Sequence, residues 1–419
     1  MDMFIKNNKI SCLVICTSMF DDEEILYLKR EFAGSLPLVF FIPYDEEIPT
    51  PLSSGDLIVK EAFMDRCFTY KGVLKKIVTL TNIPSNECVF ISKNIQFIKK
   101  ALHEPVGTIW ISNGKLSYDV IGHLPDKKIS GIEELKKAVD IRHGYFSEVF
   151  ATILKDNEYY NKSGLFFTFE VSREDVEFEV FAAGRYFNSR HECFHSHQLS
   201  HRINKSKRDG SQNNLFKTLY IAIVKKIKDL YDVNGIVRVP NRPGKRDRLG
   251  PIVRDIAKHT SLDDFSSEVI CVKDYPAHKI LDKEMRYENV KGVFRVERRL
   301  DNKHIVIIDD VFTSGATVFE CAKQLYLAGA SKVTVVVLGV NQFSNEFVIQ
   351  RHATCPKCGG RMLLRINSRT NVAFYGCEKF YDRENHCAYT EDFLSGWYRI
   401  IEENSIKSVG EEQQEDWLF

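Results

Sequence analysis

Residues 304–317, HIVIIDDVFTSGAT, bring two adjacent acids and three hydroxyl side chains together around one glycine. The apolar residues before the acids predict a buried strand, and TVFECAKQL after the glycine predicts a helix. A loop between such a strand and helix lies at the carboxyl edge of a parallel sheet, where open α/β sheets bind ligands. The N-terminus of the helix favours an anion because its N–H groups are free. The stretch therefore predicts a phosphate site next to two carboxylates.

Carboxylates beside a phosphate repel it unless they accept hydrogen bonds from the same ligand. Vicinal ribose hydroxyls supply such donors, so the ligand implied is a ribose 5-phosphate with both hydroxyls free. An ordinary solvated turn is the alternative interpretation. The loop that we expect to hold the phosphate consists of Thr313, Ser314, Gly315, Ala316 and Thr317.

The same residues resemble the phosphoribosyl pyrophosphate (PRPP) signature of type I phosphoribosyltransferases, in which an apolar run and two acids precede a Thr-[Thr/Ser]-Gly-Ala-Thr loop. Over residues 235–345 the chain resembles the competence protein F (ComF) branch of that family. The resemblance implies that Asp309 and Asp310 bind the ribose hydroxyls of PRPP. It places pyrophosphate on a basic loop with Arg242, Lys245, Arg246 and Arg248, and a mobile loop over the donor at Lys279 and Arg286.

Transfer from PRPP develops positive charge at the anomeric carbon and negative charge on the departing pyrophosphate. Mg²⁺ and the basic loop are therefore expected to stabilise the leaving group. We expect a Mg²⁺-dependent phosphoribosyltransferase that acts on a nucleobase-like acceptor. The alternative is a regulator that senses PRPP or a related nucleotide without transfer and couples it to DNA, in competence, stress or phage defence.

Four cysteines near the C-terminus have the spacing of a metal site. Two of them form a C-x₂-C pair. After a spacer, the other two form a C-x₉-C pair. Four thiolates make a closed tetrahedral Zn²⁺ site, which can fold a module that has no core of its own. His386 is an alternative to the last cysteine. The expected ligands of a structural zinc ion are Cys355, Cys358, Cys377 and Cys387.

The segment around these cysteines resembles the C-terminal zinc ribbons of type IA DNA topoisomerases, including the turn FYGC and the closing C-x-Y-T. The resemblance implies binding of single-stranded nucleic acid, with basic groups on phosphates and aromatic rings stacked on bases. A ribbon that serves only folding or protein docking is the alternative. The residues expected to contact nucleic acid are Arg361, Arg365, Arg369, Phe374, Tyr375, Tyr381 and Tyr389.

From residue 10 to about 140, apolar strands alternate with amphipathic helices, which predicts a doubly wound α/β domain. Part of it resembles the C-terminal half of haloacid dehalogenase-like phosphatases. Ser92 and Lys93 stand where that family carries metal-binding aspartates, and Cys16 and Ser18 where it carries its nucleophile and general acid. Without those carboxylates the domain lacks a cation site and an aspartyl phosphate. We expect a degenerate domain for docking or ligand sensing; a cysteine nucleophile at Cys16 is the alternative.

The second α/β unit contains a segment, at about 160–210, that fits the strand-helix pattern poorly. An antiparallel hairpin followed by a loop and short helix is expected to cap the sheet and select the acceptor. Histidines and a cysteine gather in the loop. A second metal site is one interpretation, and solvated or anion-binding histidines are the other. These residues are His191, Cys193, His195, His197 and His201.

The whole chain is therefore expected to be an α/β multidomain protein, with Rossmann-like parallel sheets and a small zinc ribbon. The expected units are residues 1–143, 144–348 and 350–395, followed by an acidic tail at 396–419. The end of the tail, QEDWLF, resembles peptides that bind the bacterial sliding clamp or other replication proteins; an ordinary amphipathic tail is the alternative.

Composition limits the classes of protein that remain. The 419 residues are 44% hydrophobic, enough for several cores, and the net charge of +1 gives no global attraction to nucleic acid. No apolar run approaches the roughly 20 residues that span a bilayer, and the first residues do not have the order of a signal peptide. We expect a cytoplasmic protein without a membrane partner, in which the 11 cysteines are thiols and metal ligands.

Overall fold

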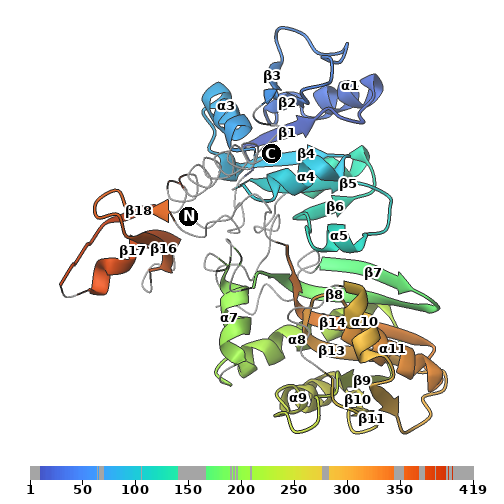
Figure 1. Cartoon of the computed structure of the whole chain (residues 1–419). Helices are drawn as coiled ribbons and strands as arrows, with labels where there is room; N and C mark the ends of the chain where they lie inside the picture. The colour runs from blue at the N-terminus through green and yellow to red at the C-terminus, as the bar shows by residue number, and fades with distance from the viewer. Residues whose placement is uncertain are drawn as a thin grey trace, which may run out of the picture.

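The chain forms two large α/β sheets and a small C-terminal ribbon, as Figure 1 shows for a computed structural model. This confirms the expected fold class. The structure describes residues 10–63, 65, 70–104, 106–139, 167–188, 191, 194, 197–207, 210–275, 283–343, 353–367, 373–382, 384–392, 395 and 399. Among the expected site residues, Lys279, Cys193, His195 and Arg369 lie outside these ranges, as does nearly all of the tail from 396 to 419.

The first sheet is wholly parallel, with the strand order β3-β2-β1-β4-β5-β6. Its central strands β1 and β4 are buried at every position because helices cover both faces. Helices α1 and α6 pack on one face, and α3 and α4 pack on the other. The strands are β1 (Cys12–Cys16), β2 (Leu38–Ile42), β3 (Leu57–Lys60), β4 (Cys88–Ser92), β5 (Gly107–Ile111) and β6 (Lys127–Ile129). The helices are α1 (Asp22–Glu31), α3 (Lys71–Thr81), α4 (Ile95–Ala101), α5 (Tyr118–Ile121) and α6 (Leu135–Val139).

The second sheet has the order β10-β9-β13-β14-β8-β7, and only the edge strand β7 is antiparallel to its neighbour. Helices α7, α8 and α9 cover one face, while α10 and α11 cover the other. The strands are β7 (Phe167–Arg173), β8 (Val176–Tyr186), β9 (Gly235–Arg238), β10 (Asp263–Asp264), β13 (His304–Phe312) and β14 (Lys332–Asn341). The helices are α7 (Gln198–Ser206), α8 (Asn213–Leu230), α9 (Gly250–Thr260), α10 (Lys283–Val290) and α11 (Ala316–Leu327). A separate antiparallel pair joins β11 (Val269–Cys271) to β12 (Phe294–Val296).

The expectation that the hairpin of β7 and β8 caps the sheet is wrong. β8 pairs in parallel with β14, so the hairpin extends the sheet instead of covering it. Nearly every side chain of β8 is buried, whereas β7 alternates between exposed and covered positions as an edge strand does. A hairpin with one buried strand is stabilised more by pairing with the open edge of a sheet than by lying on top of the sheet.

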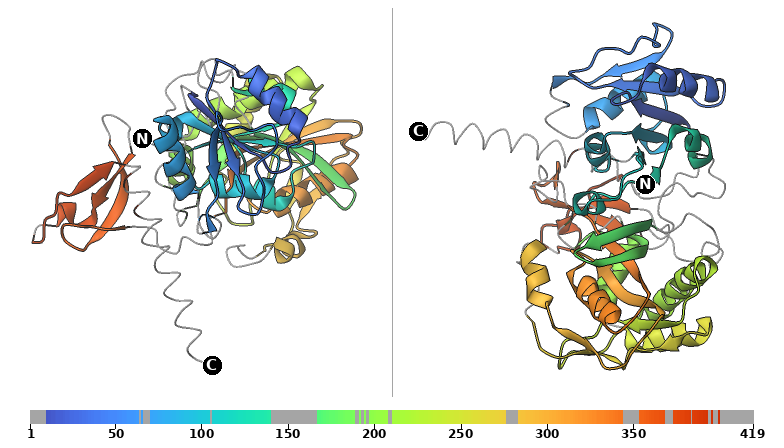
Figure 2. Two further views of the ribbon diagram at one scale, coloured as in Figure 1. Left: turned by 90° about the horizontal axis from the view of Figure 1, so that it is seen from above. Right: turned by 90° about the vertical axis from the view of Figure 1, so that its right-hand side faces the viewer.

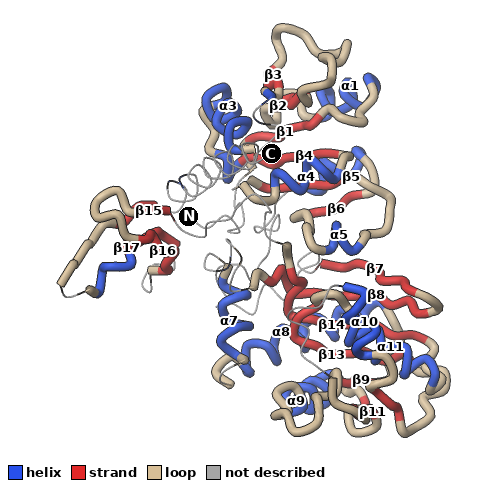
Figure 3. Tube along the Cα trace, viewed as in Figure 1, coloured by secondary structure: helices blue, strands red, loops and turns tan. Residues whose placement is uncertain are grey.

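The ribbon is a four-stranded antiparallel sheet with the order β15-β16-β17-β18. Its strands are β15 (Ala353–Thr354), β16 (Arg361–Ile366), β17 (Ala373–Cys377) and β18 (Thr390–Asp392). Figure 2 shows that it stands to one side of the two large sheets, and Figure 3 shows how much of it is strand and loop. No helix in the described ranges combines the length and apolar composition that a bilayer crossing requires.

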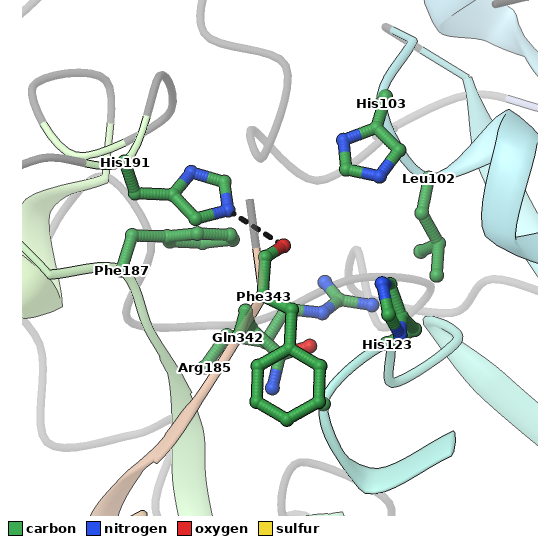
Figure 4. A pocket seen from close by; sticks show the side chains of 9 residues that line it. Leu102, His103, His123, Arg185, Phe187, His191, Gln342 and Phe343 are labelled. Carbon is green, nitrogen blue, oxygen red and sulfur yellow. Dashed lines mark hydrogen bonds between the residues drawn. The ribbon is translucent and has the colours of Figure 1, made fainter. Parts of the chain in front are cut away.

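A buried polar junction joins the two large sheets (Figure 4). Arg185, at the carboxyl end of β8, is 1% exposed and donates to Leu124 O at 2.6 Å and to Asp126 Oδ1 at 2.9 Å. Gln342, just after β14, accepts from Leu124 N–H at 2.9 Å, and the N–H of Phe343 donates to Gly122 O at 2.8 Å. Because these contacts are buried and hydrogen-bonded, they fix the first domain on the carboxyl edge of the second sheet.

Candidate functional site

The acid pair lies at the carboxyl end of the central strand β13. Asp309 and Asp310 are both partly buried, and the N–H of Asp310 donates to Asp309 Oδ1 at 2.8 Å. Burial and the neighbouring charge of Asp310 raise the pKa of Asp309 to about 7, although the charges of Arg248 and Lys207 oppose this shift. The site therefore holds carboxylates in a setting that favours added donors or cations.

The loop after the acids turns the chain tightly into α11. Gly315 has φ +80°, and a Cβ there would lie 2.5 Å from the ring of Phe312, so this turn requires glycine. Ser314 is buried, and its carbonyl accepts a hydrogen bond of 2.8 Å from Tyr287 Oη on α10. The loop thus ends at the N-terminus of a 12-residue helix, as the sequence predicts, with Thr313 exposed and Thr317 partly exposed. Such a terminus suits a phosphate.

One member of the basic loop between β9 and α9 reaches the acid pair. Arg248 Nη2 donates to Asp310 Oδ2 at 2.9 Å. Arg242 turns elsewhere, donating to Tyr275 O at 2.8 Å, while Lys245 and Arg246 are exposed. Positive charge therefore stands on the β9 side of the crevice, and a polyphosphate would find Arg248 already beside the carboxylates.

Of the two residues expected in the mobile loop, only Arg286 is described. It lies on α10, partly buried, and its positive charge acts on Tyr118 of the first domain. Burial raises the pKa of Tyr118, and the charge of Arg286 opposes that rise. In this arrangement Arg286 lies near enough to the first domain for its charge to act there.

The histidine cluster is built into the fold through separate contacts. His197 caps α7, its Nδ1 accepting from the Ser200 N–H at 3.2 Å. His201 stacks on Phe194 with ring centroids 4.5 Å apart, and His191 Nε2 bonds to Phe343 O at 3.0 Å. Within the described part of the chain these histidines form no metal group. The interpretation as a second metal site has no support there.

At the carboxyl edge of the first sheet, the lysine is paired with a carboxylate and the cysteine is buried and uncharged. Lys93, at a position where the phosphatases bind metal, donates to both carboxylate oxygens of Glu24 at 2.5 Å. Cys16 is fully buried, and burial raises the pKa of its thiol to about 12. Ser18 is also buried. A buried, protonated thiol is a poor nucleophile, so these contacts disfavour the alternative of a catalytic Cys16.

The four cysteines of the ribbon converge. Their Sγ atoms all lie within 4.8 Å of one another, with Cys358 and Cys377 at 3.4 Å and Cys355 and Cys387 at 3.8 Å. His386 is exposed, with its ring 5.6 Å from that of Phe380, so Cys387 takes the fourth position. Four thiolates at this separation fit a structural Zn²⁺ ion.

The two faces of the ribbon sheet carry different side chains. Arg365 pairs with Phe374 across β16 and β17, so both side chains lie on one face. Tyr375 points to the opposite face and is 1% exposed, so the expectation that it stacks on a base is wrong. Arg361 shares the face of Arg365 and pairs with Glu378 at 2.6 Å. The side chain of Tyr381 lies outside the described set, and Tyr389 is partly buried.

Comparison with known proteins gives a short stretch of similarity. This chain is similar to DNA utilization protein YhgH. It is 44% identical over 55 residues to the proteins of Escherichia coli (strain K12), Shigella flexneri and Salmonella typhi, which is 13% of this chain and 24% of each relative. The chain thus matches about a quarter of the length of these relatives, and no family model matches it.

Three residues of the crevice carry no signal in the sequence. Tyr220 Oη, from α8, donates to Asp309 O at 2.8 Å, and Tyr287 holds the carbonyl of Ser314. Lys207, just after α7, acts on the charge of Asp309. In sequence the two tyrosines look like ordinary core aromatics and the lysine like one of several in a basic run. Only the packing of α7 and α8 on the sheet, and of α10 on α11, brings them to the site.

Proposed function

We propose that the second domain binds PRPP with Mg²⁺ and transfers its phosphoribosyl group to a nucleobase-like acceptor. The observation that carries this proposal is the pair Asp309–Asp310, placed at the end of β13 immediately before a glycine-led helix N-terminus. The acids would accept hydrogen bonds from the ribose hydroxyls, and the loop at Gly315 would hold the 5-phosphate. Arg248, now bound to Asp310, would turn to the pyrophosphate when the donor enters.

In the proposed reaction a lone pair on a ring nitrogen of the acceptor forms a bond to C1′ of the ribose. The C1′–O bond to pyrophosphate breaks, its electron pair leaves with pyrophosphate, and the proton of the acceptor nitrogen passes to solvent. Mg²⁺, when bound, would neutralise charge that grows on the leaving group. The chain itself supplies orientation of the ribose and charge on the β9 side.

We further propose that the ribbon holds Zn²⁺ and places the protein on single-stranded nucleic acid. The face of Arg361, Arg365 and Phe374 combines cationic groups with an aromatic ring, as backbone contact and base stacking require. Similarity to DNA utilization protein YhgH supports a role in DNA use, such as competence.

A second candidate function is a sensor that binds PRPP and passes the signal to the ribbon without transfer. The buried junction at Arg185 supports it, because it connects the first domain to the carboxyl edge of the second sheet and gives a signal a route between them. The tail, whose end resembles clamp-binding peptides, would add a replication partner in either case.

Pyrophosphate release tests the transferase directly. PRPP and Mg²⁺ are supplied alone, with nucleobases, or with single-stranded DNA, to wild type and to the double variant Asp309→Asn, Asp310→Asn. Asp301→Asn, an exposed acid outside the crevice, is the matched control. Acceptor-dependent release that only the double variant loses would support transfer. Saturable PRPP binding without release would support the sensor, and no binding would refute both.

Nucleic-acid binding is tested separately. We expect Arg365→Ala and Phe374→Ala to weaken binding of a labelled single-stranded oligonucleotide about tenfold each, since a stacked base contributes about 1–3 kcal/mol. Removal of zinc by a chelator should abolish binding. Arg295→Ala, an exposed arginine on β12, should change nothing. Full binding by the chelated protein would exclude the ribbon as the contact.

A further inference from the structure

The crevice above β13 has two sides that the strand order separates. The basic loop with Arg248 follows β9, which lies on one side of β13. On the other side lie β14 and β8, against which α7 packs through Leu199 and Ile203. Figure 1 shows α7 beside these strands and α9 near β9. The chain that leaves α7 therefore lies on the side of β13 opposite the basic loop.

Lys207 begins the chain that leaves α7. It follows the last residue of α7, is exposed, and holds its ammonium 5.0 Å from the ring centre and 3.4 Å from the Oη of Tyr186. In the described part of the chain no carboxylate lies within ion-pair distance of it. Its charge nevertheless lowers the pKa of Asp309, against the stronger effect of burial. The ammonium is thus held at the crevice by an aromatic ring, with no counter-ion among the residues that the structure describes.

The wall beneath Lys207 leads to the acid pair. Tyr186 and Tyr220 belong to the same buried cluster on the α7 and α8 face of the sheet. Tyr220 then donates to Asp309 O, so the cluster connects Lys207 to the ribose position. Two buried tyrosines make this wall rigid, because each ring is packed and each hydroxyl has a partner.

The geometry needed to displace pyrophosphate indicates what the β8 and β14 side of the crevice would bind. The following step rests on the proposed function. A nucleophile that displaces pyrophosphate at C1′ must approach opposite the leaving group for its orbital to align. If pyrophosphate lies on the β9 side with Arg248, the acceptor lies on the β8 and β14 side, where Lys207 stands. A neutral acceptor would enclose the ammonium without a counter-ion, whereas an anionic acceptor would pair with it.

We propose that Lys207 binds an anionic substituent of the acceptor, so that the protein selects heteroaromatic rings that carry a carboxylate over their neutral counterparts. Lys207 is then a specificity-determining residue of the acceptor side and has no part in holding PRPP.

Two matched pairs of acceptors test this selection. Uracil-6-carboxylate is compared with uracil, and pyridine-3-carboxylate with pyridine-3-carboxamide, by kcat/KM for pyrophosphate release. The variants are Lys207→Gln and Lys207→Arg, and the control is Lys205→Gln, an exposed lysine on the same helix. PRPP affinity is measured by calorimetry without acceptor. If turnover is too slow to measure, binding of each ring to the PRPP complex replaces kcat/KM.

We expect wild type to prefer the carboxylated ring of at least one pair by about tenfold or more. Lys207→Gln should remove that preference by weakening only the carboxylated ring, Lys207→Arg should keep part of it, and Lys205→Gln should leave it intact. Equal preference for both rings in wild type, or an equal loss for both in Lys207→Gln, would overturn the proposal. So would weaker PRPP binding by Lys207→Gln, since that places the lysine at the donor. Failure of wild type to bind PRPP would instead refute the proposed function.

Discussion

The two large sheets share one architecture and differ at their carboxyl edges. In the first sheet Lys93 is held by Glu24, and the thiol of Cys16 is buried and protonated. In the second, Asp309 and Asp310 lie side by side, and one of them has a pKa near 7. At the first edge the charge of Lys93 is paired, while the second edge keeps two adjacent carboxylates with Arg248 beside them. Function in such folds thus depends on the loops at the sheet edge and on their unmet charge.

The loops that follow β1 and β13 also differ in how closely the fold surrounds their backbone. Met19, after β1, adopts φ +67° and is exposed. Gly315, after β13, adopts φ +80° with no room for a Cβ. A left-handed residue is tolerated in both places, but only the second is crowded by the fold. The crowded turn is the one that we propose binds phosphate.

The largest effect should come from breaking the junction between the sheets. Arg185→Met leaves the buried carboxylate of Asp126 without its cation, which costs about 3–5 kcal/mol. We expect urea unfolding to begin at lower concentration and to split into two transitions. Lys115→Ala removes two exposed ion pairs between the same two domains, with Glu170 and Glu177, and should leave the curve unchanged. A single unshifted transition in Arg185→Met would show that the junction does not couple the sheets.

Substitutions at the carboxyl edges of the two sheets should have different effects on the affinity for PRPP. The double variant Asp309→Asn, Asp310→Asn is expected to weaken PRPP binding at least about 100-fold, since each hydrogen bond to a charged group contributes about 1.5–3 kcal/mol. Cys16→Ala, at the corresponding edge of the first sheet, should leave affinity within about twofold. Calorimetry with PRPP and Mg²⁺ measures both. Loss of binding in Cys16→Ala at unchanged stability would mean that the first edge also binds the ligand.

Substitutions at Gly315 and Met19, the two residues with positive φ, should change the unfolding free energy by different amounts. Gly315→Ala forces a Cβ against Phe312 at a positive φ, and we expect a loss of about 1–3 kcal/mol in unfolding free energy and weaker phosphate binding. Met19→Gly relieves a positive φ in open space and should stay within about 1 kcal/mol of wild type. Thermal and urea unfolding at one pH measure the two changes. Equal losses would contradict the difference in crowding.

The smallest effect concerns pH. The pKa of Asp309 is about 7 in the folded chain and near 4 when unfolded, so its ionisation destabilises the fold as pH rises between these values. Asp309→Asn should therefore stabilise the protein at pH 8, by about 1–2 kcal/mol because the residue is only partly buried, and by much less at pH 5. Cys16→Ser should show no such pH dependence, because the thiol stays protonated up to about pH 12. A stability gain for Asp309→Asn that is equal at both pH values would contradict the raised pKa.

Much of the site was predictable because its signals are local. The acids, the hydroxyls and Gly315 are contiguous, and the cysteine spacing limits how the thiols can meet. The predicted contact of Tyr375 with a base failed because neighbouring strand residues point to opposite faces, and only the register of β16 and β17 decides which face is covered. The hairpin of β7 and β8 was predictable as a hairpin, but its pairing with β14 was not.

The sequence by itself determined the alternation of strands and helices, the turn at Gly315 and the four convergent cysteines, because periodicity, backbone freedom and spacing act over short distances along the chain. Tertiary structure alone decided which distant side chains meet the acid pair. Arg248 lies 62 residues before Asp310, and Tyr220 lies 89 residues before Asp309. Lys207 stands farther still along the chain, and Arg185 finds Asp126 in another domain. Such contacts depend on the order of strands in the sheet and the faces that helices cover, which no local pattern specifies.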